Sequence, residues 1–223
     1  MEIPVHNRIL GLAALAGVCG MLAPVRPASA QSDPDKSVTG TGVPAGYVGL
    51  TDKPDAKISD AKYSVANGHW EIQTGPAHIV YAAKDVGNGT YTATATFDQL
   101  QKPTHPEAYG LFFGGQNLDA SSQRKYAYFL VRGTGEYLIK VRDGDKTTSV
   151  KEWTASPAVP KEDASGRATY MLAVQVTADS VRYLVNGKGV AATSKTAVPT
   201  NGIAGLRVNH NLHIRVTPVA LTR

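Results

Sequence analysis

The chain has 223 residues, with 23 lysines and arginines against 18 aspartates and glutamates, a formal charge of +5 at pH 7, and one cysteine. That cysteine, Cys19, lies in an apolar N-terminal segment, so the rest of the chain can form no disulfide framework, thiol nucleophile or thiolate metal site. The positive charges are scattered, with only short groups such as residues 124–126. The charge pattern therefore argues against a nucleic-acid partner.

Residues 1–30 are typical of a cleaved export signal. A polar start with Arg8 precedes an apolar run at 9–23, and small residues end the segment at Ala30. The apolar run is shorter than the roughly 20 residues that cross a bilayer. A lipid-attachment signal at Cys19 is disfavoured, because valine rather than a small residue precedes it. We predict cleavage after Ala30, no membrane insertion afterwards, and a periplasmic or extracellular location.

The exported part of the chain is predicted to be one domain with a short lead-in. Residues 31–46 are rich in Gly, Pro, Ser and Thr and offer little apolar surface to bury, which indicates a flexible segment. From Tyr47 to Arg223 the length suits a single domain. No internal repeat of propeller or solenoid type is present.

Short apolar runs separated by turn residues follow one another through residues 47–223, with almost no helix signals. The run 90–97, TYTATATF, alternates strictly between threonine and apolar residues, which is the period of a strand with one buried face. Similar patterns predict strands at 69–74, 77–82, 109–113, 126–131, 137–141, 168–177, 180–186, 202–208 and 211–217.

The connections between these strands carry their own signals. Gly133-Thr134-Gly135 is a three-residue hairpin turn, and residues 186–189, NGKG, form another turn. The polar, proline-bearing stretch 143–168 is predicted to be a long loop with a short strand near Val150–Trp153. In the hairpin that follows, one face should enter the core: Tyr170, Leu172, Val174, Val176, Val181, Tyr183 and Val185.

Three segments resemble a known family of exported bacterial proteins. They are GHWEIQTGPAHIVY, the block EAYGLFFGGQNLD with YAYFLVRGTGEYLIKVRDG, and the ending VRYLVNGK to NGIAGLRVNHNLHI. The chain is similar in these runs to the concanavalin A-like lectin and glucanase jelly rolls, and to the related 3-keto-disaccharide hydrolase domain. The resemblance covers residues 65–217. It implies an all-β jelly-roll sandwich of two antiparallel sheets with ten or more strands and a concave surface where relatives bind sugars.

The catalytic residues of that superfamily are not found in this chain. Retaining glucanases of the superfamily carry E-x-D-x-x-E on one strand, and no such cluster is present. No H-E-x-x-H, G-x-S-x-G or phosphate-binding loop is present either. If the protein is an enzyme, the acid and base candidates are Glu107, Glu136 and Asp143.

Aromatic and arginine residues offer a better case for binding than the carboxylates do for catalysis. Sugars are held by flat apolar rings and by planar polar groups on their hydroxyls. The candidates for ligand binding are Tyr109, Tyr126, Arg132, Arg142, Trp153, Arg207, Asn209 and His210. His210 and His213 point to opposite faces of an extended strand, and the Asp143–Asp145 turn lacks further ligands, so we predict no metal site and no cofactor.

The leading hypothesis is a non-catalytic exported jelly-roll module that binds carbohydrate or another ligand outside the cytoplasm. The first alternative is a glycoside-acting hydrolase of the 3-keto-disaccharide type. The second is a structural or protein-interaction domain of the cell envelope. Sequence patterns do not decide among them, because this architecture hosts all three kinds of protein.

Overall fold

The computed structural model describes Met1, residues 42–73 and residues 75–223. The predicted export signal and most of the predicted lead-in therefore lie outside the described residues. The described residues from Gly42 onward belong to one compact unit, Gln31–Arg223. Val43 and Tyr47 already pack against its core. None of the described helices is long and apolar enough to cross a membrane.

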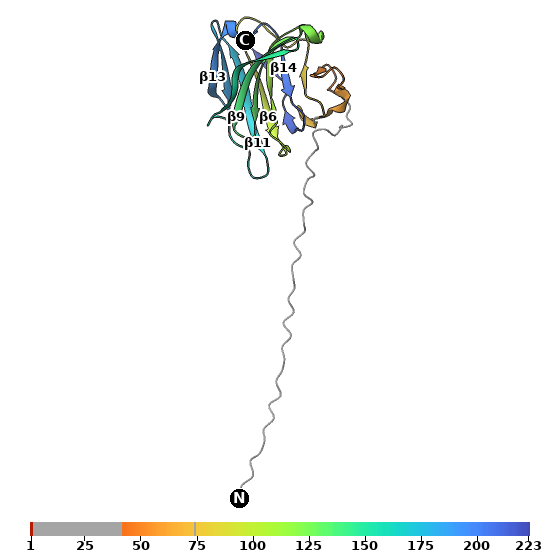
Figure 1. The fold of residues 1–223 in the computed structure, drawn as a ribbon, viewed down its shortest axis with the longest axis vertical. Coiled ribbons are helices and arrows are strands. Elements are labelled where there is room, and N and C mark those ends of the chain that lie inside the picture. Colours follow the sequence, from red (N-terminus) through yellow and green to blue (C-terminus); the bar gives the residue numbers. More distant parts are fainter. Residues whose placement is uncertain (2–41, 74) are drawn as a thin grey trace. The chain divides into compact units, whose positions relative to one another are not determined.

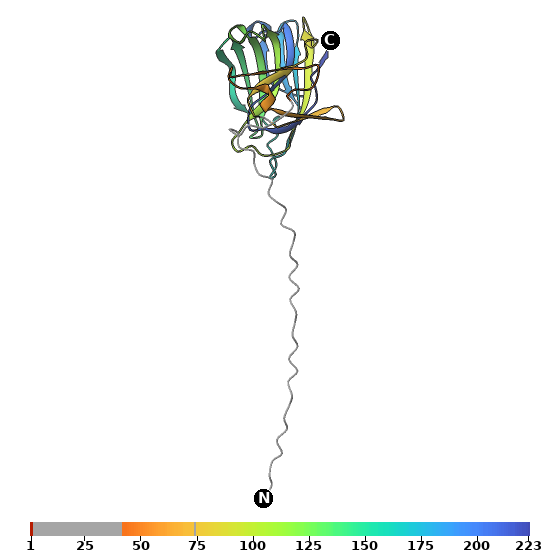
Figure 2. The same cartoon turned by 90° about the vertical axis from the view of Figure 1, so that its right-hand side faces the viewer.

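The described residues form two antiparallel sheets, which are seen from two directions in Figures 1 and 2. Sheet A contains, in spatial order, β1 (Val48–Thr51), β4 (His78–Tyr81), β14 (Gly202–Val208), β7 (Ala108–Gln116), β8 (Lys125–Arg132), β9 (Glu136–Asp143) and β10 (Lys146–Ala155), with β5 (Val86–Gly87) paired to β14.

Sheet B also has eight strands. In spatial order they are β13 (Lys188–Ser194), β12 (Ser180–Val185), β11 (Ala168–Val176), β6 (Tyr91–Gln99), β15 (His213–Val216), β3 (His69–Gln73) and β2 (Lys62–Ala66), with β16 (Ala220–Thr222) paired to β6. Three single 3₁₀ turns complete the described elements: η1 (Ile58–Asp60), η2 (Ser121–Gln123) and η3 (Lys195–Ala197). The expectation of an all-β sandwich of two antiparallel sheets is confirmed.

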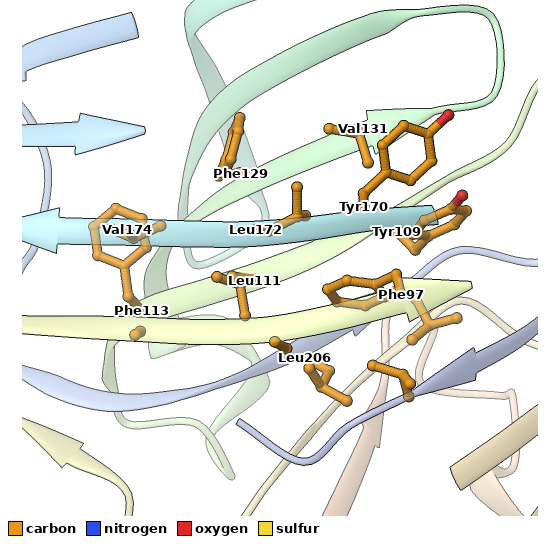
Figure 3. Packing of buried hydrophobic residues seen from close by; sticks show 14 of the residues in the cluster. Phe97, Tyr109, Leu111, Phe113, Phe129, Val131, Tyr170, Leu172, Val174 and Leu206 are labelled. Carbon is orange, nitrogen blue, oxygen red and sulfur yellow. The ribbon is translucent and has the colours of Figure 1, made fainter. Parts of the chain in front are cut away.

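The main core fills the space between the two sheets. In β6 every second residue from Tyr91 to Gln99 is buried, as the threonine alternation predicts. Figure 3 shows Phe97, Leu172 and Leu111 packed together in this interior. All seven inward residues expected in the β11–β12 hairpin are buried there: Tyr170, Leu172, Val174, Val176, Val181, Tyr183 and Val185.

Sheet A is buried on both of its faces in its central strands. Its inner face meets sheet B, while its outer face carries a second apolar cluster that includes Phe112, Tyr126, Tyr128, Leu130 and Leu138. In β7 and β8 the alternate residues enter the two clusters in turn. This explains why these strands have almost continuous apolar sequences.

The prediction of a loop at 143–168 is wrong for residues 146–155, although the short strand predicted near Val150–Trp153 is confirmed as part of a longer strand. Residues 146–155 form β10, a strand that pairs with β9 through two register shifts. Its side chains are exposed or half-buried throughout. A strand at the edge of a sheet, exposed on both faces, needs no alternation of apolar and polar residues, so period two did not reveal it. The short or exposed strands β1, β2, β5, β13 and β16 also lacked that signal.

A buried polar contact links the two sheets. Nε2 of His78, in β4 of sheet A, lies within hydrogen-bonding distance of the Tyr63 hydroxyl, in β2 of sheet B. Nδ1 of His78 lies 2.8 Å from the carbonyl oxygen of Pro76. These two partners suit a neutral ring that donates from Nδ1 and accepts at Nε2. Burial lowers the pKa of His78 to about 4, although the Pro76 carbonyl acts in the opposite direction.

We expect Leu172→Ala to destabilise the fold by about 3 kcal/mol, because Leu172 is fully buried and its truncation leaves a cavity between the sheets. The matched control is Met171→Ala in the same strand, whose side chain is 46% exposed. It should cost less than about 1 kcal/mol. Urea unfolding of both variants measures the difference, and equal losses would contradict the assignment of strand faces.

We expect the free energy of unfolding of the protein to depend on pH, because His78 is buried. Its pKa is lower in the folded state than in the unfolded chain, so the unfolded state binds more protons below pH 6.5 and stability falls as the pH drops. The loss should reach about 3 kcal/mol by pH 4, because each tenfold loss of proton affinity corresponds to about 1.4 kcal/mol. His78→Gln should remove most of this slope between pH 7.5 and 4.5 in denaturant titrations. An unchanged slope would mean that His78 is protonated in the folded protein.

Candidate functional site

The outer face of sheet A carries a buried aromatic cluster built from neighbouring strands. Phe112 in β7 contacts Tyr126 in β8, with ring centroids 5.3 Å apart, and Tyr126 contacts Tyr128, at 5.8 Å. Tyr81 in β4 meets Phe112 edge to face at 6.1 Å. Each ring is fixed by its neighbours and is at most 7% exposed, so these rings form a packed layer rather than a surface open to a ligand.

A network of charged groups lies at one end of this face. The two terminal nitrogens of Arg207, in β14, donate to the two carboxylate oxygens of Asp52, at 2.8 and 2.6 Å. Nη1 of Arg142, in β9, donates to one of the same oxygens at 3.4 Å. Asp52 follows the edge strand β1, so this network joins the chain after β1 to the middle of the sheet.

Arg207 is held from several sides. Its guanidinium lies 4.9 Å from the centre of the Tyr128 ring, and Nη1 also donates to the Tyr126 hydroxyl at 3.4 Å. Burial acts to lower the pKa of Arg207, but the nearby Tyr126 and the hydrogen-bonded Asp52 raise it above the ordinary value. The side chain is therefore a permanent buried cation.

Asp52 is correspondingly a permanent anion. Burial opposes ionisation of its carboxyl, but the hydrogen bonds from Arg207 and the charges of Arg207, Arg142 and Arg124 lower its pKa. Beside it lies a surface hollow of about 300 Å³, lined by polar and apolar residues that include Asp52, Pro54, Ser121, Arg124, Arg142 and Asp145. A hollow of this size with convergent donors and acceptors suits a small polar ligand.

The other end of the outer face carries the predicted tryptophan. The guanidinium carbon of Arg132, at the end of β8, lies 4.2 Å from the centre of the Trp153 ring, and Trp153 is only partly buried. Nη2 and Nε of Arg132 pair with Oε2 of Glu136 at 2.7 and 2.9 Å. From Tyr126 to Arg132 strand β8 advances about 20 Å, so the two ends of the face are well separated.

The catalytic candidates are not brought together as a pair. Glu136 begins β9 and Asp143 ends it, so their backbones lie about 23 Å apart, at 3.3 Å per residue. Glycosidase carboxyl pairs are about 5 to 9.5 Å apart. The pKa of Glu136 is lowered, first by a hydrogen bond from Thr134 and then by Arg132, so this carboxylate is a poor proton donor. Asp143 is exposed and pairs with Lys125 at 2.9 Å.

The third catalytic candidate, Glu107, lies in a separate cluster where β7 begins and β14 ends. Its Oε2 accepts a hydrogen bond from Nδ2 of Asn209 at 3.0 Å, and its Oε1 lies 3.2 Å from Nε2 of His210. His105 joins the same cluster, with Nε2 3.0 Å from Oε1 of Glu107. Two of the predicted ligand-binding residues therefore gather here rather than among the aromatic rings.

His105 was not among the candidates from the sequence, where His210 was compared only with His213. The structure separates those two, since His213 pairs instead with Glu71 at 2.8 Å. The spacing His105-Pro106-Glu107 could have served as a signal, because residues two apart share one side of an extended segment. No local pattern places that segment beside His210, however.

Tyr126, a predicted ligand-binding residue, is fully buried in the apolar cluster on the outer face of sheet A. Tyr109 is the predicted ligand-binding residue that the structure places between the two sheets. It is fully buried between the sheets, where its ring stacks on Phe97 at 5.4 Å and its hydroxyl donates to Oε1 of Gln99 at 3.3 Å. Figure 3 shows it among the core side chains. In β7 the odd-numbered residues from Tyr109 to Phe113 face sheet B, so Tyr109 has no path to a ligand on the outer face.

The fold is similar to that of several solved structures. The carbohydrate-binding module CBM66 from Bacillus subtilis matches 83% of this chain and 99% of its own, with a TM-score of 0.56 and 11% identity. A protein of unknown function with a galectin-like fold from Bacillus subtilis has a TM-score of 0.58 and 12% identity, over 78% of this chain and 88% of its own. The Bacillus licheniformis β-glucanase has a TM-score of 0.56 and 8% identity, over 83% and 96%.

These similarities show that the fold is a concanavalin A-like jelly roll, as expected from the sequence. No family model and no curated protein matches the chain. The resemblance to the 3-keto-disaccharide hydrolase domain therefore stays a prediction. The matched structures include both a binding module and an enzyme, so the fold alone does not choose between the two classes.

We expect Asp52→Asn to destabilise the protein by about 3 kcal/mol at pH 7, because it leaves the buried Arg207 without its counterion. The control is Asp143→Asn, which removes an exposed ion pair with Lys125 and should cost less than about 1 kcal/mol. Chemical denaturation of both variants gives the comparison. Similar losses in the two would mean that Asp52 does not neutralise a buried charge.

Proposed function

We propose that this protein is an exported, non-catalytic module that binds carbohydrate on the outer face of sheet A. The observation that carries the proposal is the pair Trp153 and Arg132. The Arg132 guanidinium, whose direction is fixed by Glu136, lies over one face of the partly exposed Trp153 ring and leaves the other face for a ligand. A flat apolar ring next to oriented donors and acceptors is the arrangement that a sugar ring and its hydroxyls require.

The other end of the same face supports this proposal. The hollow beside Asp52 offers Arg142 and Arg124 as donors and Asp52 as an acceptor. The aromatic rings between the two ends are buried, so a ligand would contact the side chains at the ends and not these rings. A ligand that reached both ends would be an oligosaccharide, because the ends lie about 20 Å apart.

Catalysis is less well supported than binding. Glu136 and Asp143 lie too far apart to act on one glycosidic bond, and Glu136 is engaged by Arg132. The similarity in fold to CBM66, which is described as a carbohydrate-binding module, favours binding, and the similarity to a β-glucanase keeps the enzymatic alternative open.

The test begins with retention of the protein on immobilised polysaccharides or a glycan array, followed by a fluorescence titration with soluble oligosaccharides of the glycans that retain it. The chain has two tryptophans, and Trp70 is only 4% exposed while Trp153 is partly exposed. A bound sugar should therefore change the emission of Trp153. Trp153→Ala should weaken binding about tenfold or more, which corresponds to about 1.4 kcal/mol.

Lys151→Ala is the matched control, because Lys151 is an exposed residue of the same strand. It should leave binding unchanged. Retention of the protein on no glycan would overturn the proposal and favour a protein partner, to be sought by co-purification from the cell envelope. Release of new reducing ends during the titration would instead favour the glycoside-acting enzyme.

A further inference from the structure

Three potential metal ligands from separate parts of the chain converge at one end of sheet A. His105 and Glu107 lie just before β7, and His210 lies just after β14. One nitrogen from each imidazole and one oxygen of the carboxylate all lie within 4.8 Å of one another. These three residues belong neither to the buried aromatic cluster of sheet A nor to the network around Asp52.

The distances within the cluster suit a bound metal ion. Zinc binds histidine nitrogens and carboxylate oxygens at about 2.0 to 2.2 Å, so neighbouring ligand atoms of a tetrahedral site lie about 3.3 Å apart. Oε1 of Glu107 is 3.0 Å from Nε2 of His105 and 3.2 Å from Nε2 of His210. The two imidazole centroids are 5.5 Å apart, so little movement would close the third edge of the site.

Neighbouring groups hold the ligands in this arrangement. The side-chain amide of Asn209 donates to Oε2 of Glu107 at 3.0 Å, which leaves Oε1 directed at the two imidazoles. The backbone N–H of Asn209 donates to the carbonyl of Ala108 at 3.1 Å. Nδ2 of Asn211 also donates to the Thr104 hydroxyl at 2.6 Å, which joins the two ligand-bearing loops. Partners of this kind orient metal ligands in known sites.

Two buried polar atoms beside the cluster have no hydrogen-bond partner. They are Oδ1 of Asn209 and Nδ1 of His210. A buried polar atom without a partner costs free energy, so such atoms usually face a water, an ion or a ligand. Water molecules in the coordination shell of a metal would supply the missing partners.

We propose that His105, Glu107 and His210 bind a divalent transition-metal ion of the zinc class. Two imidazoles and one carboxylate favour zinc, cobalt, nickel or copper over calcium or magnesium, which take oxygen ligands. The side chains of His105 and His210 are 47% and 42% exposed, so the site is open to solvent on one side. A fourth position is left for water or for an oxygen of a ligand, as in three-ligand zinc sites. Metal binding at this cluster does not depend on sugar binding.

The test is a calorimetric titration of the tag-free, chelator-treated protein with zinc chloride. We expect one ion to bind per chain with saturable heat. His105→Ala and Glu107→Gln should each weaken binding by about 100-fold or more, since each removes one of three ligands. The His105 side chain is 47% exposed, so its removal should leave the fold intact, which the thermal midpoint without metal checks.

The control is His213→Gln, because His213 also pairs with a glutamate but does not belong to the three-residue cluster. It should bind zinc as the unmodified protein does. Cobalt(II) in place of zinc should give visible absorption bands that disappear in His210→Ala. Absence of saturable zinc binding, or binding that survives both His105→Ala and Glu107→Gln, would overturn the proposal and leave the cluster as a hydrogen-bonded group.

Discussion

The arrangement of the outer face of sheet A depends on how the buried charge of Arg207 is neutralised. Its guanidinium lies in the middle of a sheet whose other face is the hydrophobic core, and an unpaired cation there would cost several kcal/mol. Asp52 supplies both carboxylate oxygens to it. Because Asp52 follows the edge strand β1, this pair also fixes the segment that forms one wall of the neighbouring hollow.

The outer face of sheet A is rigid because the central strands of this sheet carry buried side chains on both sides. A sheet with one solvent-facing side usually presents separate polar side chains there, whereas the central strands of this sheet present large apolar and aromatic groups on both sides. The rings of Phe112, Tyr126 and Tyr128 contact one another and leave few alternative rotamers. These buried rings hold β8 in place, and β8 carries Arg132 at its end.

The cluster of His105, Glu107 and His210 lies on loops at the end of the sandwich and not on a face of a sheet. Its three residues lie on the short connections at the end of the strands, where the backbone is free of ladder hydrogen bonds and side chains can converge from two directions. The paired strands β7 and β14 set the separation of these connections, since Val208 and Tyr109 are register partners. The three side chains are thus positioned by the sheet, although none of them belongs to a strand.

Local sequence patterns were enough to establish the fold class and the buried faces of strands with one exposed side, because period-two alternation, as in residues 91–99, is a direct consequence of strand geometry. Residue type alone also suggested Trp153, Arg132, Arg142 and Arg207 as ligand-binding residues, although Arg207 is buried against Asp52. Three-dimensional packing was needed to show that Tyr109 faces the interior, that residues 146–155 form an exposed edge strand, and that His105 meets His210. All three findings arise from packing between segments that are distant in the sequence: burial on a second face, strand pairing at an edge, and a contact across 105 residues. No local periodicity of the sequence encodes such packing.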